Sequence, residues 1–206
     1  DVTAIVYDVN SGGGEAAGCF ELADEAFALR GTKPTISVVD SACYSAAYAL
    51  ASTSDQVVVT PTGGAGSVGV YTMHVDMSKM LEDWGLNITL IHAGDHKVDG
   101  HPYAELPDDV RADMQKSVDA TYNKFVESVA RNRNMSVEAV KATQARCYSA
   151  DDALALGLID SVASPLEAIR AFLGGPSETS KDDESTGESL MELNEAKQAE
   201  RQRVGA

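Results

Sequence analysis

The chain has few basic residues for its size. Its 206 residues contain 16 Lys and Arg against 32 Asp and Glu, which gives a net charge of −16 at pH 7. An acidic surface repels nucleic acids and anionic lipids, so a DNA-binding or membrane-surface function is disfavoured. The sequence also lacks an apolar run long enough to span a bilayer and has no signal-peptide pattern at its start. We therefore expect a soluble, cytoplasmic protein.

Cysteine is also scarce. The three cysteines, Cys19, Cys43 and Cys147, are odd in number and do not have the spacing of metal ligands. This pattern argues against both a disulfide framework and a zinc site. It is typical of a protein from a reducing compartment.

The length and the 44% apolar content favour one domain with an appendage. We predict a domain over residues 1–173 and an acidic, largely disordered tail over residues 174–206, with a short helix at 190–201. The tail is either a plain solvated segment or a joint to another domain. The chain begins with a strand of central type at residues 1–9, so we expect earlier strands of the natural product to be missing.

Alternating strands and helices predict an α/β fold with a mostly parallel sheet flanked by helices. Nearly continuous Val and Ile at the start indicate a strand buried on both faces. Apolar residues at helical spacing predict a long helix over residues 107–134 and a short one over 78–84. Further strands are predicted at residues 35–39, 56–60, 70–75, 87–92 and 158–162.

The strand ending near Val39 leads through Ser45 into an alanine-rich helix. A sharp strand-to-helix turn exposes the turn residue and leaves the first backbone N–H groups of the helix unpaired. Such donors suit a developing oxyanion, so Ser45 is a candidate nucleophile. The alternative is a serine that only caps its own helix.

Two glycine-rich segments flank this turn in sequence. Residues 10–15 read NSGGGE, and residues 63–69 read GGAGSVG. The first segment is either an oxyanion hole and backbone clamp for an extended peptide or a tight turn between strand and helix. The second is predicted to line a substrate groove. A nucleotide site is disfavoured, because neither the dinucleotide glycine spacing nor a P-loop lysine is present.

Three residues are candidates for the remaining chemistry. Lys97 lies in a polar loop, where most lysines are simply solvated. His74 is the nearest downstream histidine and is the alternative base of a histidine triad. Cys43 is an alternative thiol nucleophile, although a small packing residue is the simpler interpretation.

These segments together resemble signal peptide peptidase A and the phage capsid-assembly proteases, the peptidase family S49. Residues 10–14, with Gly18 beyond, resemble the oxyanion motif of that family, although Gly12 stands where proline is usual. Residues 45–51 resemble its nucleophile motif with alanines in place of glycines. The general-base motif is matched by residues 94–97 followed by Pro102. Residues 63–69 and 149–159 also match, so the resemblance extends from about Val2 to Leu173.

The resemblance implies a ClpP/crotonase-like fold and a Ser/Lys dyad of Ser45 and Lys97. It places the oxyanion hole at the N–H groups of Gly13 and Ala46. Gly12, Gly14, Gly66 and Ser67 become substrate-binding candidates. A lysine acts as a general base only where burial or positive neighbours lower its pKa. No metal or organic cofactor is implied.

For the whole protein, the resemblance implies a prohead protease that cleaves scaffold, portal or coat proteins during capsid maturation. It also implies a homo-oligomeric ring, in which Lys97 faces either Ser45 of its own subunit or that of a neighbour. The alternatives are a membrane-associated signal peptide peptidase and a non-catalytic assembly module that binds extended peptides. A crotonase-type acyl-CoA enzyme shares the fold, so fold alone does not decide.

Overall fold

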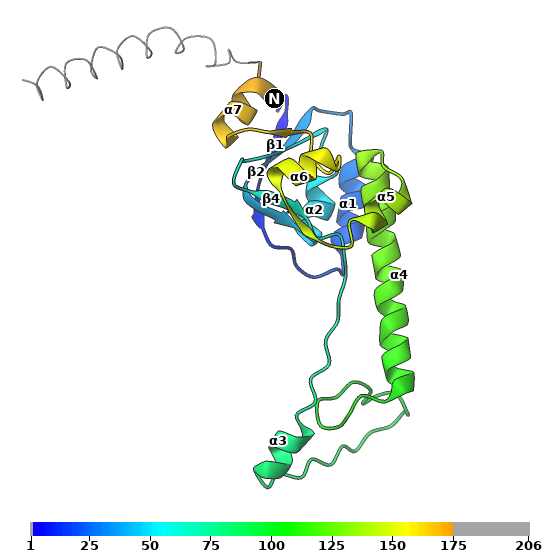
Figure 1. The fold of residues 1–206 in the computed structure, drawn as a ribbon. Coiled ribbons are helices and arrows are strands. Elements are labelled where there is room, and N and C mark those ends of the chain that lie inside the picture. Colours follow the sequence, from blue (N-terminus) through cyan, green and yellow to red (C-terminus); the bar gives the residue numbers. More distant parts are fainter. Residues whose placement is uncertain (1, 175–206) are drawn as a thin grey trace, which may run out of the picture.

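The computed structural model describes residues 2–174, which form an α/β domain with a projecting arm (Figure 1). Apart from Gly174, the predicted tail lies outside this range, as does its helix at 190–201, so the domain boundary after residue 173 stays a prediction. The strands, in chain order, are β1 (Ile5–Ser11), β2 (Thr35–Tyr44), β3 (Gln56–Val59), β4 (Gly64–Gly66), β5 (Cys147–Ser149) and β6 (Ser161–Val162). The helices are α1 (Cys19–Ala28), α2 (Ala46–Ala51), α3 (Ser78–Asp83), α4 (Asp108–Arg133), α5 (Val137–Ala142), α6 (Ala150–Ala155) and α7 (Pro165–Phe172).

The strand β2 is the centre of the sheet. It pairs in parallel with β1, β3 and β4, and β3 pairs in parallel with β6. The single antiparallel pair among the described strands joins β4 to β5. The predicted class, α/β with a mostly parallel sheet and flanking helices, is confirmed.

Alternate residues of β2 face two different helical layers, as the period of two in a strand requires. Val39 packs with Tyr48 of α2 and Phe125 of α4 on one face. Ile36 and Val38 pack with α7 on the other face. The four consecutive residues 36–39 are all buried, as expected for a central strand that is covered on both faces.

The first strand differs from the prediction. β1 pairs with β2 alone among the described strands, and its side chains Val6 and Tyr7 are 38% and 41% exposed. Burial of this strand on both faces is therefore not found within residues 2–174. Its carboxyl end nevertheless meets the end of β2 at one edge of the sheet, where Ser11 pairs with Cys43.

Residues 70–107 form a segment that we call the arm, which extends away from the sheet and carries α3 at its far end (Figure 1). The predicted helix at 78–84 is confirmed as α3. The strands predicted at 70–75 and 87–92 are wrong, because the structure assigns no strand there. Val, Ile and Thr favour extended backbone, but a strand also requires a neighbour with which to form a ladder.

Helix α4 connects the arm to the domain. Its 26 residues agree with the helix predicted over 107–134. At 1.5 Å per residue it is about 39 Å long. Its C-terminal part packs in the core through Phe125, Val126 and Val129. Its N-terminal part projects with the arm (Figure 1). Within residues 2–174, no helix combines the length and apolar character needed to cross a bilayer.

Candidate active site

Ser45 occupies the turn between β2 and α2. Its φ of 55° and ψ of −126° are unusual for a residue with a side chain, and such strain costs about 1–3 kcal/mol. Its backbone N–H donates to the Gly66 carbonyl at 2.9 Å, which ties the turn to β4. Its hydroxyl makes no capping hydrogen bond to α2, so the interpretation as a simple helix cap is wrong. The sharp turn presents a free hydroxyl at the edge of the sheet.

The glycine loop after β1 lies directly against this serine. Gly13 has a φ of 113°, and a Cβ at this position would lie 2.7 Å from Ser45 Cβ and 3.0 Å from the Tyr44 carbonyl oxygen. Such contacts are too short for real carbon atoms, so only glycine fits here. The two βα turns, distant in sequence, therefore meet at one point.

The predicted oxyanion donors differ in their present partners. The N–H of Gly13 donates to Ser11 Oγ at 3.2 Å. The N–H of Ala46 begins helix α2, where the first N–H groups have no partner within the helix. Both backbone groups flank Ser45. An anion between them would exchange the Ser11 bond for a stronger charge-assisted one.

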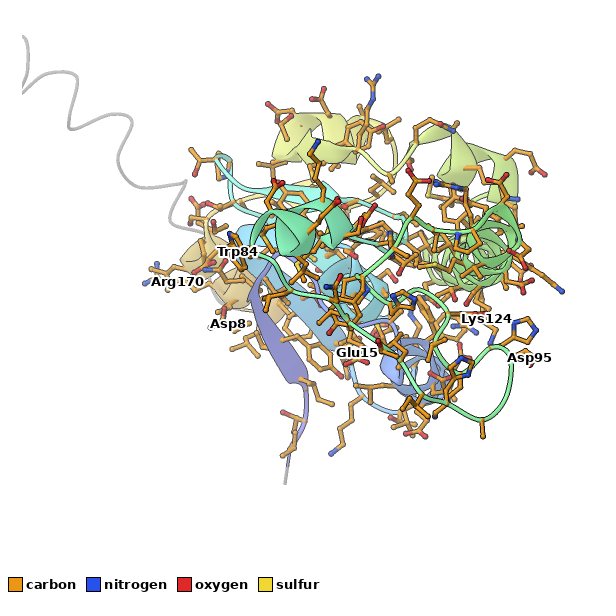
Figure 2. The ribbon with its side chains drawn as sticks, turned by 90° about the horizontal axis from the view of Figure 1, so that it is seen from below. Asp8, Glu15, Trp84, Asp95, Lys124 and Arg170 are labelled. Atoms are coloured by element: carbon orange, nitrogen blue, oxygen red, sulfur yellow. The ribbon has the colours of Figure 1, made fainter. Side chains whose placement is uncertain are left out.

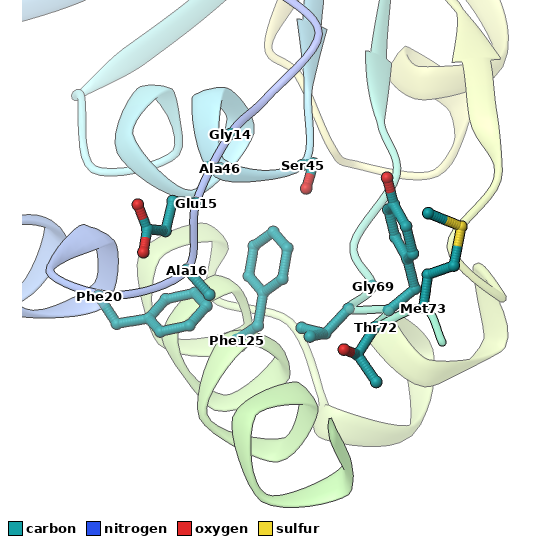
Figure 3. A pocket seen from close by; sticks show the side chains of 12 residues that line it. Gly14, Glu15, Ala16, Phe20, Ser45, Ala46, Gly69, Thr72, Met73 and Phe125 are labelled. Carbon is teal, nitrogen blue, oxygen red and sulfur yellow. The ribbon is translucent and has the colours of Figure 1, made fainter. Parts of the chain in front are cut away.

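A cavity of about 390 Å³ opens beside Ser45. Phe20, Phe125, Ala16, Ala46 and Val70 supply apolar surface, and Glu15 is the one charged residue among those that line it (Figure 3). The remaining lining residues are Gly14, Ser45, Gly69, Tyr71, Thr72 and Met73. The cavity is thus a mainly apolar pocket that opens next to the candidate nucleophile.

The other predicted substrate residues have different positions. Gly14 lines the cavity, whereas Gly12 is exposed with no atom within 4 Å of an added Cβ. Gly66 is buried in β4, where it accepts the Ser45 N–H. Ser67 has a φ of 54° and donates its N–H to the Arg146 carbonyl. Gly66 and Ser67 thus support the turn through backbone hydrogen bonds and do not line the cavity. Gly69, in the same glycine-rich segment, does line it.

Lys97 is not brought to Ser45 within one chain. It lies on an exposed turn of the arm, where its N–H donates to the Gly94 carbonyl, and it does not line the Ser45 cavity. Figure 2 shows the neighbouring Asp95 on an outlying loop of the arm. The alternative base His74 is also on the arm, where its Nε2 contacts the His101 carbonyl at 3.0 Å. Within the described residues, the candidate nucleophile and the predicted backbone donors thus lie together, whereas neither candidate base lines the cavity beside them.

Cys43 is an unsuitable nucleophile. It is fully buried in the core, and burial raises the pKa of its thiol to about 12. Thiols attack as thiolates, so this sulfur stays unreactive. Among residues 2–174, no three His, Cys, Asp or Glu side chains converge in a way that could hold a metal ion.

Sequence reasoning missed the aromatic residues of the pocket. Phe125 belongs to the apolar stripe of α4, and its spacing alone indicates only a core face. Its ring lies 5.3 Å from the ring of Phe20 on α1, and both rings line the cavity. Only the packing of α4 against α1 shows that Phe125 of this stripe lines the cavity beside Ser45.

A partly buried polar cluster anchors helix α2, which follows the turn. Tyr48 of α2 donates its hydroxyl to the Leu158 carbonyl at 2.6 Å. Nearby, Arg133 of α4 forms an ion pair with Asp160 at 2.8 Å. Burial by itself would raise the pKa of Asp160, but hydrogen bonds from Arg133 and from the Val57 N–H hold it below its usual value. These contacts join α2, α4 and the strand segment around residue 160.

Comparison with known proteins agrees with this geometry. The model of peptidase family S49 matches residues 28–172. Capsid assembly protease C of Escherichia phage lambda is 39% identical over 168 residues, which cover 82% of this chain and 38% of the relative. A putative signal peptide peptidase SppA of Enterococcus faecium is 27% identical, covering 82% of this chain and 49% of the relative. The chain therefore spans less than half the length of each of these two proteins.

A solved structure shares the fold. The 1510-N membrane-bound stomatin-specific protease, solved as a mutant, superposes with a TM-score of 0.54 and is 14% identical. The match covers 82% of this chain and 69% of that one. This likeness supports the assignment of the fold.

Proposed function

The chain belongs to peptidase family S49, and from this premise we propose that it is a serine peptidase with Ser45 as nucleophile and Lys97 as general base. Membership confirms the family indicated by the sequence motifs. The observation that carries the assignment of Ser45 is its free hydroxyl on a strained strand-to-helix turn, in contact with Gly13. This combination is typical of an activated serine beside backbone donors.

In the proposed reaction, Ser45 Oγ attacks the carbonyl carbon of the scissile peptide and its proton passes to the neutral Lys97 amine. The N–H groups of Gly13 and Ala46 stabilise the oxyanion that forms. The protonated amine then gives its proton to the leaving amine, and the C–N bond breaks to leave an ester on Ser45. Water, deprotonated by the same lysine, hydrolyses this ester and restores the serine.

We propose that the lysine comes from a second copy of the chain. Lys97 lies on the exposed arm, away from the cavity beside Ser45, so a single chain supports the nucleophile without its base. An ammonium in water holds its proton at neutral pH, whereas burial in an apolar interface favours the neutral amine. Docking of the arm onto a neighbour would provide both the proximity and the burial.

Apolar side chains on the arm support this assembly. Tyr71, Met73, Trp84 and Ile91 are 88%, 73%, 67% and 97% exposed. Exposed apolar surface of this extent marks an interaction site. Each chain would receive a neighbour's arm and offer its own. A head-to-tail contact of this kind forms a ring when its rotation closes, and this ring is the assembly that we propose.

The proposed substrates are scaffold, portal or coat proteins inside the assembling prohead in the host cytoplasm. This part of the proposal follows from the similarity to a capsid assembly protease. The similarity to a putative signal peptide peptidase favours a second candidate, the degradation of cleaved signal peptides at a membrane. An assembly module without catalysis is the third. The domain boundary at residue 173, with a tail beyond it, remains part of this proposal.

Complementation between two inactive variants tests the proposal. Ser45→Ala and Lys97→Ala are each expected to lose nearly all cleavage of an unfolded protein substrate. Co-expressed in equal amounts, they form some sites with an intact serine and a neighbour's intact lysine, so we expect about a quarter of the wild-type activity. No recovery would place the dyad within one chain, and an active Lys97→Ala variant would assign the base to another residue.

A serine-reactive fluorophosphonate probe separates enzyme from assembly module. Labelling of the wild type and not of Ser45→Ala is expected for the peptidase. A module that only binds peptides would leave both unlabelled. Cleavage of purified phage scaffold protein, compared with cleavage of a synthetic signal peptide, then distinguishes the two enzymatic candidates.

A further inference from the structure

The backbone around the nucleophile turn is strained at more than one point. Among residues 2–174, five residues that carry side chains have a positive φ, and one of these, Asn134, simply ends helix α4. The other four belong to segments that contact one another around the turn: Ser45, Ser67, Gln144 and Ala145. Strained conformations persist only where the surrounding structure enforces them, and they gather at functional sites.

Residues 143–148, which lead from α5 into β5, form a closed loop that we call the clasp. The Thr143 carbonyl accepts hydrogen bonds from the Arg146 N–H at 3.1 Å and from the Tyr148 hydroxyl at 2.9 Å. Gln144 and Ala145 lie between these anchor points, with φ values of 50° and 54°. Thr143 is only 2% exposed, so the clasp is fixed to the core at its first residue.

The clasp holds the segment that in turn holds the nucleophile. The Arg146 carbonyl accepts the Ser67 N–H at 2.8 Å. The adjacent Gly66 carbonyl accepts the Ser45 N–H at 2.9 Å. A Cβ added to Gly66 would lie 2.8 Å from the Arg146 carbonyl oxygen, so the two backbones are in direct contact. Two hydrogen bonds through adjacent residues therefore connect the clasp to the backbone of Ser45.

A second contact lies at the edge of the cavity beside Ser45. Gly69 lines this cavity (Figure 3), and a Cβ added to it would lie 2.5 Å from Ala145 Cβ. Gly69 does not itself have a positive φ. A side chain is therefore excluded at this position by the approach of the clasp and not by the local backbone angle.

We infer that the clasp positions the nucleophile, with Ala145 and Tyr148 as positioning residues that hold the Ser45 backbone in its strained conformation. This role rests on the proposed peptidase function and goes beyond it by assigning residues outside the cavity to the reaction. Neither Ala145 nor Tyr148 lines that cavity, so both act through the backbone of Ser45. Without such support, a turn with a φ of 55° and a ψ of −126° would relax.

Tyr148→Phe tests the clasp with a minimal change. It removes the hydroxyl that closes the loop onto the Thr143 carbonyl and keeps the ring. We expect kcat for an unfolded protein substrate to fall about ten-fold with little change in KM, and the rate of fluorophosphonate labelling of Ser45 to fall by the same factor. A role in folding alone would lower stability in urea and leave both rates of the folded protein unchanged, which would overturn the inference.

Tyr122→Phe is the matched control. Tyr122 is a partly buried tyrosine of α4 that packs against the core, and no hydrogen bond to its hydroxyl occurs among the described residues. Both rates should stay at the wild-type value in this variant. An equal loss in Tyr122→Phe would show that the effect of Tyr148→Phe is not specific to the clasp.

Exchange of a methyl group tests the contact between Gly69 and Ala145. Gly69→Ala should lower the labelling rate about ten-fold, because its methyl group displaces the clasp. Adding Ala145→Gly to the same chain removes the opposing methyl group and should restore most of the rate. A methyl group that merely blocked the cavity would not be rescued in this way, so failure of rescue in a chain that circular dichroism shows to be folded would overturn the inference.

Complementation between chains shows which side of the active site the clasp serves. In a mixture of Ser45→Ala and Lys97→Ala chains, the restored sites take their serine from the Lys97→Ala chain alone. Tyr148→Phe should therefore reduce the restored activity when it is placed in the Lys97→Ala chain, and leave it unchanged in the Ser45→Ala chain. Equal reductions in both placements would overturn the inference.

The proposed function and the clasp fail in different ways. A wild-type chain that the fluorophosphonate probe does not label would refute the peptidase itself. A labelled wild type together with an unaltered labelling rate in Tyr148→Phe would refute the clasp alone. If complementation fails because both dyad residues act within one chain, the labelling rate of Tyr148→Phe still decides the role of the clasp.

Discussion

Gly13 and Ser45 approach each other so closely that a Cβ on Gly13 would lie 2.7 Å from Ser45 Cβ and 3.2 Å from Ser45 Oγ. The contact joins the end of β1 to the end of β2 across 32 residues of sequence (45 minus 13). It places the backbone N–H of Gly13 beside the hydroxyl that is proposed to attack.

Gly13→Ala is expected to abolish peptidase activity. The added methyl group collides with Ser45 and requires a positive φ that alanine rarely adopts, so the loop must move and take its N–H with it. Loss of one oxyanion donor lowers kcat by about 10²–10³-fold. The measurement is kcat for an unfolded protein substrate. Gly12→Ala is the matched control, since nothing lies within 4 Å of its added Cβ, and equal losses in both variants would contradict the prediction.

Ser45→Gly is expected to have a higher free energy of unfolding than Ser45→Ala. Both variants lack the hydroxyl, but only glycine relaxes the strain of a φ of 55° and a ψ of −126°. We expect a difference of about 1 kcal/mol in the free energy of unfolding in urea.

The control pair is Asp40→Gly and Asp40→Ala, at an exposed position of β2 that has no positive φ. There the glycine variant should be the less stable of the two, because glycine weakens a strand. A Ser45→Gly variant that is no more stable than Ser45→Ala would show that the turn is unstrained.

Asp160→Asn is expected to flatten the dependence of stability on acid pH. The folded-state pKa of Asp160 is below its unfolded value, so its contribution is present at neutral pH. This stabilising contribution is lost as the pH falls from the ordinary carboxyl pKa of about 4 through the lower pKa of the folded state. The measurement is the free energy of unfolding at a series of acid pH values.

At neutral pH the same substitution should cost about 2 kcal/mol, because the charge of Arg133 loses its partner. The cost is reduced relative to a fully buried pair, since the Asp160 side chain is 40% exposed. Asp24→Asn, at the exposed pair with Arg131, is the control and should change stability little. Parallel pH profiles of the wild type and Asp160→Asn would contradict this prediction.

Ile91→Asp is expected to prevent assembly and to lower activity with it. Ile91 is 97% exposed on the arm, and a charge there would not be tolerated in an apolar interface. The one tryptophan of the chain, Trp84, is also on the arm and reports the interface directly. Its emission should shift to shorter wavelength as the wild-type concentration rises and should remain unshifted in Ile91→Asp.

Sedimentation velocity measures the assembly state in parallel. Asp151→Asn, at an exposed position of α6 outside the arm, is the control and should leave both assembly and emission unchanged. A fully assembled and active Ile91→Asp protein would show that the arm does not form the contact between subunits.

Local sequence patterns predicted much of the fold. The spacing of apolar residues predicted α4 almost to the residue. The motifs also indicated the family and the turn at Ser45, because glycine content and strand-to-helix punctuation are local properties of the chain. The prediction of strands at residues 70–75 and 87–92 was wrong because local propensity does not show whether a neighbouring strand is available for pairing.

Several features depended on contacts between distant segments. Strands β4 and β5 pair residues more than eighty positions apart, as Ala65 with Tyr148, and a three-residue glycine segment carries no sign of such a partner. Phe125 reads as one more core residue of α4 until the packing against Phe20 places it in the lining of the cavity beside Ser45.

The sequence by itself determined which residues are candidates for the chemistry, because the strand, turn and glycine patterns around Ser45 arise from local backbone preferences. Only the tertiary structure decided which of them meet. Gly13 and Ser45 come together because parallel strands end at one edge of the sheet, whereas the arm holds Lys97 away from the cavity. Spacing along a chain does not determine distance in space once a long helix and an extended arm lie between two residues.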